Sequence, residues 1–251
     1  MSGAERVLCE TLLAARRGNR QLPLPAADWA AFDLAAGYRV QQAVARAMGW
    51  FQDGHPPAWK LGGSPASGPA CAPVPADAIF ESPWQLPAGF AVQLGIEAEV
   101  AVRLRCDLAP DADMAAVWAA IDCLYPCIEL CDIRLDAQQP LPASVQRADQ
   151  QFNRALILGP ALRVLARPDW SALRLAVQDD GHEIFRGEGC HPYGNPLHSL
   201  PWLARHAAEH WDGLRAGDLI ATGSWSGIHW AQPGARVRVE LDEFGSVEMR
   251  L

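Results

Sequence analysis

Lysine is almost absent from this chain of 251 residues: Lys60 is the only one, and the rest of its 21 basic residues are arginines. Acidic residues number 29 and give a formal net charge of -8 at pH 7. Because no basic stripe interleaved with aromatic residues occurs, we expect no nucleic-acid partner. No apolar run is long enough to span a membrane, and residues 1–6 lack the apolar segment of a secretory signal, so we expect a cytoplasmic protein without membrane contact.

The seven cysteines form no CxxC pair and are odd in number. Cys123, Cys127 and Cys131 recur every four residues, as on one side of a helix, but their neighbourhood offers no partners for a zinc site. We therefore expect buried, reduced thiols that serve packing rather than disulfides or zinc ligands.

The periodicity of apolar residues predicts helices over residues 5–17 and 33–48. From His55 onward, frequent proline and glycine predict a long loop-rich segment, which in a compact domain is usually functional. A further helix is expected over 114–125, ended by Pro126, and another over 197–214. Strands are expected over 91–104, 127–135, 155–165, 173–185 with a hairpin turn at 179–181, 218–223, 236–241 and 247–251. This order favours an α+β fold with a sheet that is closed or folded on itself.

Two carboxylates stand two residues apart in the apolar run Ile96-Glu97-Ala98-Glu99-Val100. In a strand, this spacing sends both to one face, where like charges need a cation or strong donors if the face is buried. Glu129 adds a third carboxylate between apolar residues. Three oxygen ligands favour Mg²⁺ or Mn²⁺ over zinc. The alternative is an edge strand whose carboxylates face water beside Arg103.

Lys60 and Asp77 are candidates for proton transfer. A partly buried lysine can lose its proton near neutral pH, which an arginine cannot, although a solvated Lys60 would need no such role. Asp77 is a second candidate, or alternatively the cap of a short turn. His191 lies in a loop that leads into the helix expected over 197–214. Its side chain either orients this loop or takes part in the reaction. The small-residue turn around Ser224 ends a strand, where backbone amides and hydroxyl groups can meet an anionic ligand.

Several segments occur together in a specific order. They are Lys60–Gly62, Ile96–Glu99, Ile128–Arg134, Gly189–Pro192, Trp202–Ala204 and Leu214–Ser224. From about Ala36 to the C-terminus, this ordered set resembles the 2-keto-4-pentenoate hydratase group of the fumarylacetoacetate hydrolase superfamily.

The resemblance implies a twisted β-roll or barrel-like domain of the C-terminal type of that superfamily, with outer helices and homo-oligomeric assembly. We accordingly expect a helical segment over 1–54 and a metal-binding catalytic β-roll over 55–251, together forming one compact unit. The implied metal ligands are Glu97, Glu99 and Glu129, for Mg²⁺ or Mn²⁺. The implied catalytic residues are Lys60 and Asp77, and the implied substrate-binding residues are Leu61, Gln150, Asn153 and Ser224.

The implied reaction is the addition of water to a 2-hydroxy-2,4-dienoate, giving a 4-hydroxy-2-oxo acid. Residues 148–153 depart from the run typical of the group, with Gln150 and Phe152 in place of smaller residues. Three alternatives therefore stay open. They are decarboxylation of a 2-oxo-3-enedioate, hydrolysis of an acylpyruvate, and a catalytically silent partner subunit of a hydratase or decarboxylase.

Overall fold

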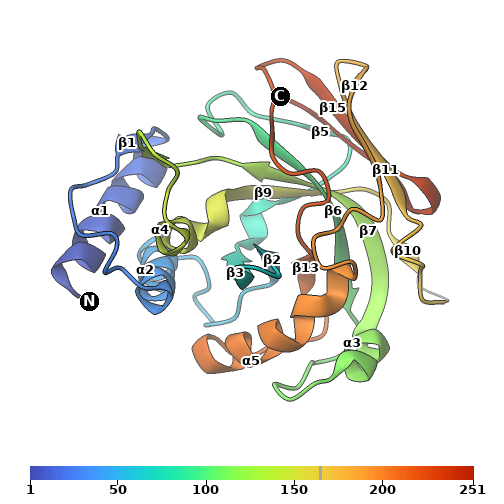
Figure 1. Cartoon of the computed structure of the whole chain (residues 1–251), viewed down its shortest axis with the longest axis horizontal. Coiled ribbons are helices and arrows are strands. Elements are labelled where there is room, and N and C mark those ends of the chain that lie inside the picture. The colour runs from blue at the N-terminus through green and yellow to red at the C-terminus, as the bar shows by residue number, and fades with distance from the viewer. Residues whose placement is uncertain (164–165) are drawn as a thin grey trace.

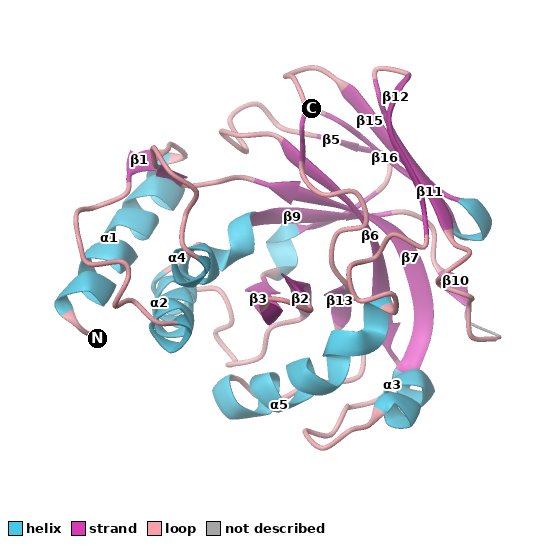
Figure 2. Ribbon diagram, viewed as in Figure 1, coloured by secondary structure: helices cyan, strands magenta, loops and turns pink. Residues whose placement is uncertain are grey.

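The computed structural model describes residues 1–163 and 166–251 as helices packed around two β-sheets (Figure 1). Over these residues, the larger sheet has nine strands and the smaller has five. Helices α1, α2 and α4 gather at one end of the molecule, whereas α5 and α3 lie at the bottom of the view in Figure 2. None of the helices within the described ranges has both the length and the apolar character needed to cross a bilayer.

The larger sheet follows the order β3-β2-β13-β6-β7-β9-β4, with β10 paired to β7 and β14 paired to β6. Its strands are β2 (Ala58–Ser64), β3 (Gly68–Val74), β4 (Ile79–Glu81), β6 (Gly95–Leu104), β7 (Ile121–Cys131), β9 (Asn153–Leu158), β10 (Leu162–Arg163), β13 (Leu219–Ala221) and β14 (His229–Trp230).

The smaller sheet follows the order β12-β11-β15-β16-β5, and strands β1 and β8 form a separate parallel pair. These strands are β1 (Leu22–Pro23), β5 (Trp84–Gln85), β8 (Leu135–Asp136), β11 (Arg174–Asp179), β12 (His182–Glu188), β15 (Arg236–Leu241) and β16 (Gly245–Arg250). The α-helices are α1 (Gly3–Gly18), α2 (Leu34–Ala47), α3 (Met114–Ala120), α4 (Ala143–Ala148) and α5 (Leu200–His210).

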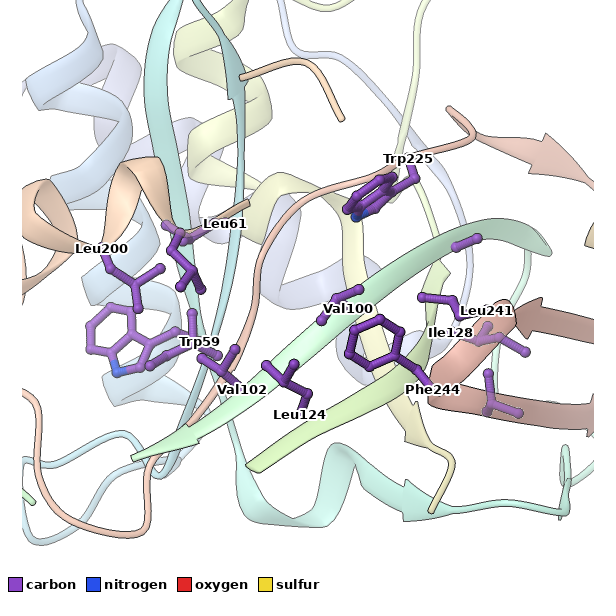
Figure 3. Packing of buried hydrophobic residues seen from close by; sticks show 14 of the residues in the cluster. Trp59, Leu61, Val100, Val102, Leu124, Ile128, Leu200, Trp225, Leu241 and Phe244 are labelled. Atoms are coloured by element: carbon purple, nitrogen blue, oxygen red, sulfur yellow. The ribbon is translucent and has the colours of Figure 1, made fainter. Parts of the chain in front are cut away.

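The central strands β6 and β7 are covered on both faces. On one face, Val100 and Ile128 belong to the main apolar core, which also contains Leu200 of α5 and Leu241 of the smaller sheet (Figure 3). On the other face, Ala101 belongs to a second buried cluster formed mostly by small and branched side chains. Successive strand residues point to opposite faces, so the polar residues of β6 necessarily face this second side.

Helices α1 and α2 confirm the two predicted N-terminal helices to within two residues at each end. The Ser2 hydroxyl caps α1 and the Asp33 carboxylate caps α2, each accepting a backbone N–H bond from the first turn. Leu8 and Val40 pack with Val145 of α4 in a third apolar cluster. The division of the chain at residue 54 stays a prediction.

The expected loop over residues 55–75 was wrong in part, because β2 and β3 form an antiparallel hairpin there. Pro69 and Pro73 both lie on β3, and β3 stands at the edge of the larger sheet. A proline on an edge strand removes no hydrogen bond with a neighbour when its nitrogen faces outward, so these prolines do not prevent a strand.

The helix expected over 114–125 ends at Ala120, and residues 121–125 begin β7. Pro126 lies within that strand rather than ending a helix. On one side it pairs with Val100 of β6. On the other side it faces Gly159, which lies one residue beyond the end of β9, and its carbonyl oxygen accepts a hydrogen bond from Gly159 N. Its missing N–H therefore interrupts no hydrogen bond between β7 and β9.

Other boundaries also shift. Residues 91–94 precede β6 without joining it, β7 ends at Cys131 rather than at 135, and α5 covers only part of 197–214. The strand expected over 155–165 is divided into β9 and β10, and its residues 164–165 lie outside the described residues. The hairpin at 179–181 is confirmed, with positive φ at Asp180 and Gly181.

Gly37 of α2 provides a test of the packing between α2 and α4. A Cβ atom there would lie 2.3 Å from the backbone oxygen of Ser144. We expect Gly37→Ala to lower the free energy of unfolding by about 1–3 kcal/mol, although alanine is the better helix former by ~1 kcal/mol. Gly3→Ala is the matched control, because open space surrounds Gly3. Equal stability of the two variants in urea unfolding would contradict this account.

Candidate metal centre

Three carboxylates meet on the second face of the larger sheet. Glu97 of β6 is directly opposite Glu129 of β7 in the strand register, and Glu99 follows two residues along the same face. Strand β6 lies between β13 and β7 in the middle of the sheet, and Glu99 and Glu129 are fully buried. The alternative of a solvent-facing edge strand is therefore wrong, and the predicted shared face is confirmed.

Lys60 of β2 provides the positive charge of this cluster. Its Nζ lies 3.0 Å from Glu129 Oε2 and 3.9 Å from Glu97 Oε2, and it donates a hydrogen bond to the carbonyl oxygen of Gln151. The side chain is only 6% exposed. Lys60 is thus a buried ion-pair partner, not a solvated surface lysine.

Two neutral donors hold the carboxylates in place. Asn153 Nδ2 donates to Glu129 Oε1 at 2.8 Å, and the backbone N–H of Gly223 donates to Glu99 Oε2 at 2.9 Å. Gly223 has a φ of +108°, which strains any residue with a Cβ. The second oxygen of Glu99, Oε1, is buried without a hydrogen-bond partner.

Burial and mutual repulsion perturb the acids of the cluster. Burial raises the pKa of Glu129 to about 7, against the opposing effect of the Lys60 charge. The pKa of Glu99 is also raised, by burial and by the charges of Glu129 and Glu97. Burial disfavours the ammonium of Lys60, but the charges of Glu129 and Glu97 outweigh it and raise the pKa of Lys60.

This donor set fits a divalent cation. When all groups are ionised, three carboxylates face one ammonium, so two negative charges are left uncompensated in a buried place. Within the described part of the chain, Oε1 of Glu99 is an acceptor without a donor. Carboxylate oxygens are the ligands preferred by Mg²⁺ and Mn²⁺. Glu97, Glu99 and Glu129 are thus the residues that would hold such an ion.

A cavity of about 190 Å³ opens onto this cluster. It is lined by Lys60 and Glu97 and by two of the predicted substrate-binding residues, Leu61 and Ser224. Thr222 and Gly223, from the small-residue turn predicted to meet an anionic ligand, also line it. Further lining residues had not been predicted as ligand-binding: Gly62, Gly63, Gln146, Gln151, Phe152, Pro192, Tyr193 and Ile228. Most of them are neighbours in sequence of predicted residues, which is the one signal that could have indicated them.

The structure places Asp77 away from Lys60. Asp77 lies in a short 3-10 helix and lines a separate cavity of about 240 Å³, together with Arg134 and Arg154. Its role in proton transfer stays a prediction, and no side-chain capping bond supports the alternative role of a cap.

Gln150 and Asn153 also line this second cavity rather than the one at Lys60. The side chain of Gln150 is buried and donates to the carbonyl oxygen of Gln41, and Asn153 supports Glu129 instead of facing the Lys60 cavity. Their substrate-binding roles stay predictions.

The turn between the two cavities is strained. Gln150, Gln151 and Phe152 have φ values of 54°, 52° and 67°, which non-glycine residues rarely adopt in succession. Such residues cost on the order of 1–3 kcal/mol each and cluster at functional sites. The turn points the carbonyl oxygen of Gln151 at Lys60 and exposes Phe152 to the cavity.

His191 of the predicted loop lies at the rim as a neutral imidazole. Its Nε2 donates to the carbonyl oxygen of Thr222 at 3.1 Å, and its Nδ1 accepts from the N–H of Tyr193. Burial lowers the pKa of His191 to about 4. These contacts fit the predicted role of orienting the loop.

Comparison with known proteins agrees with this geometry. The family described as Fumarylacetoacetate (FAA) hydrolase C-terminal matches residues 40–251. The chain belongs to this family. Its similarity to the 2-keto-4-pentenoate hydratase group and its predicted α+β fold are thereby confirmed.

The chain is similar to curated members of two activities. It is 31% identical over 156 residues to 4-oxalocrotonate decarboxylase of Pseudomonas putida, covering 62% of the chain and 59% of that protein. It is 28% identical over 163 residues to 2-keto-4-pentenoate hydratase of Burkholderia vietnamiensis, covering 64% of the chain and 62% of that protein. The matches thus span about 60% of the length of these relatives.

The fold is shared over almost the whole chain with a solved structure. A 4-oxalocrotonate decarboxylase from Pseudomonas putida G7, complexed with magnesium and adipate, superposes with a TM-score of 0.86 at 24% identity. The superposition covers 98% of this chain and 96% of that one. Both the helical segment and the β-roll therefore belong to the shared fold.

Removing one carboxylate tests the metal centre. We expect Glu129→Gln to weaken Mn²⁺ binding by at least about tenfold, ~1.4 kcal/mol, because it removes a charged oxygen from the buried set. Isothermal titration of the apoprotein measures this directly. Glu81→Gln, at an exposed position of β4, is the control and should bind like the parent. Unchanged affinity in Glu129→Gln would remove the basis of the assignment.

His191 gives a prediction for pH. Its pKa is about 4 in the folded protein and 6.5 in the reference state, so its contribution to stability is complete above pH 6.5 and is lost as pH falls to 4. The stability advantage of the parent over His191→Gln should shrink by up to about 3 kcal/mol across this window. Urea unfolding at several pH values measures it, with His182→Gln at an exposed position as control. A constant difference would refute the neutral buried imidazole.

Proposed function

We propose that this protein is a metal-dependent hydro-lyase that adds water to a 2-hydroxy-2,4-dienoate of the 2-keto-4-pentenoate type. The observation that carries the proposal is the buried ion pairing of Lys60, the sole lysine, with Glu129 and Glu97 beside a small cavity that Lys60 and Glu97 line. Family membership and the similarity to a hydratase support it.

The lining of the cavity suits a substrate with one carboxylate. Among the described residues that line it, Lys60 is the only cationic side chain, and no arginine is present. His191 is neutral near pH 7 because burial lowers its pKa to about 4. A divalent ion held by the three carboxylates would supply Lewis-acid polarisation of the carboxylate and adjacent oxygen of a 2-oxo acid.

Lys60 has the position required to move a proton. In the reaction, the 2-hydroxyl group of the dienoate loses its proton and C5 gains one; water then adds its oxygen at C4 and a proton at C3. Lys60 lines the cavity, and its ammonium can donate a proton there. The charges of Glu129 and Glu97 raise its pKa, so it can take up a proton from the substrate only when a bound cation compensates these carboxylates. The backbone oxygen of Gln151 holds Nζ in this orientation.

A second candidate is decarboxylation of a 2-oxo-3-enedioate. The similarity to 4-oxalocrotonate decarboxylase in sequence and over the whole fold favours it. The side chains of Gln146 and Gln151 also line the cavity and offer amide donors for a second carboxylate.

The cytoplasmic location and the assembly into homo-oligomers stay predictions.

A panel of substrates separates these activities. The purified protein with Mg²⁺ or Mn²⁺ is given 2-hydroxypenta-2,4-dienoate, 2-oxo-3-hexenedioate and an acylpyruvate, while dienol absorbance and CO₂ release are recorded. We expect loss of the first substrate without CO₂. Release of CO₂ from the second substrate alone would establish the decarboxylase instead, and no turnover of any substrate by metal-loaded protein would refute both.

Lys60→Met is the variant that tests the proton carrier. We expect kcat to fall by about 10²–10⁴-fold, because general acid–base catalysis contributes on that order. Metal binding should persist, since the three carboxylates remain. Loss of activity together with loss of bound metal would instead make Lys60 a structural residue.

A further inference from the structure

The cavity beside Asp77 has a cationic wall. Its volume is about 240 Å³, and four arginines line it, which are Arg16, Arg20, Arg134 and Arg154. Among the described residues that line it are neither Lys60 nor any glutamate of the metal centre. The cavity is thus the electrostatic opposite of the acidic cluster at Lys60, and the proposed reaction makes no use of its arginines.

The four arginines outnumber the acids beside them. Of the described residues that line the cavity, Asp77 and Asp132 are the acidic ones. Asp149, behind the wall, lies 3.2 Å from Arg16 and 3.9 Å from Arg134. When all of these groups are ionised, one positive charge is left over. A surplus charge at a largely buried place is costly unless an anion compensates it.

Arg16 and Arg134 keep hydrogen-bond donors in reserve. Their side chains are only 7% and 4% exposed. Within the described part of the chain, neither Nε of Arg16 nor Nη2 of Arg134 has an acceptor. Burial lowers the pKa of Arg16 to about 9, and the charge of Arg134 acts in the same direction. Two buried guanidinium groups with free donors, next to a surplus charge, are the complement of an anion with two oxygens.

Much of the remaining wall is apolar. It includes Met48 and Trp50 at the end of α2, together with Val92 and Ile133. The guanidinium of Arg16 lies 5.2 Å from the centroid of a ring of Trp50, so the cationic and the apolar wall adjoin. One surplus charge beside apolar side chains suits an organic monoanion better than inorganic phosphate, which has no apolar part.

We propose that this cavity binds a small organic acid, whose carboxylate pairs with Arg16 and Arg134 and whose apolar part lies against Met48 and Trp50. Guanidinium groups bind carboxylates through charge-assisted hydrogen bonds in a fixed planar geometry. Arg134 Nη1 also donates to the carbonyl oxygen of Phe152, so the ligand is connected to the strained turn through one side chain. The site is separate from the proposed function and does not depend on it.

Calorimetric titration of the metal-free protein with benzoate tests the site. Without a metal ion, the acidic cluster offers no cation that could hold the carboxylate. We expect one benzoate per chain with a Kd of about 1 mM or lower. Benzamide, which has the same shape without the charge, and inorganic phosphate should each bind at least about tenfold more weakly. No binding of benzoate, or equal binding of benzamide, overturns the proposal, and tighter binding of phosphate overturns the organic class of ligand.

Variants locate the bound benzoate. Arg16→Met should weaken its binding at least about tenfold. Arg17→Met is the matched control, because Arg17 is the next residue of α1 but is exposed and does not line the cavity. Lys60→Met should also bind benzoate like the parent, which separates this cavity from the one at Lys60.

If Arg16→Met does not fold, as judged by circular dichroism, Arg16→Lys replaces it. Lysine keeps a positive charge beside Asp149 but lacks the planar set of donors, so binding should weaken by at least about threefold. Unchanged affinity in the folded Arg16 variant, or loss of binding in Lys60→Met, overturns the site. Either result leaves the metal centre and the proposed reaction untouched.

Discussion

Three buried carboxylates facing one ammonium are the interaction on which the rest of the site depends. Removing two uncompensated charges from water is costly, so the cluster persists only where protein donors and a cation compensate it. Lys60, Asn153 and the Gly223 N–H supply part of this compensation from three different strands or strand ends. The consecutive strands β2, β13, β6, β7 and β9 of the larger sheet bring these groups together.

The strained turn at 150–152 is held in place by hydrogen bonds and an ion pair from residues outside the Lys60 cavity. The carbonyl oxygen of Phe152 accepts hydrogen bonds from Asp132 N and Arg134 Nη1. Buried Asp149, just before the turn, accepts from Arg134 N and pairs with Arg16 of α1 at 3.2 Å. The N-terminal helix is thereby linked to the turn that orients Lys60.

Local patterns predicted much of this molecule. Period-two spacing placed Glu97 and Glu99 on one face, and the helical periodicity of apolar residues located α2. Strand register, which depends on distant pairing, could not be predicted; it sets Glu129 opposite Glu97. The hairpin of β2 and β3 was missed because an edge position, visible only in the sheet order, makes its prolines acceptable. Spacing likewise gave no sign that Asp77 lines a different cavity from Lys60.

The pairing of β6 with β7 also limits how this site can diversify. A shift of one residue in either strand would turn its metal-facing side chains toward the apolar core under α5, so insertions and deletions there destroy the centre outright. At the turn 150–152 and the rim around Ser224, by contrast, only backbone groups hold Lys60 and Glu99, so side chains there can change without moving the centre. New substrates can therefore arise by substitution at these loops while the chemistry of the centre is inherited unchanged.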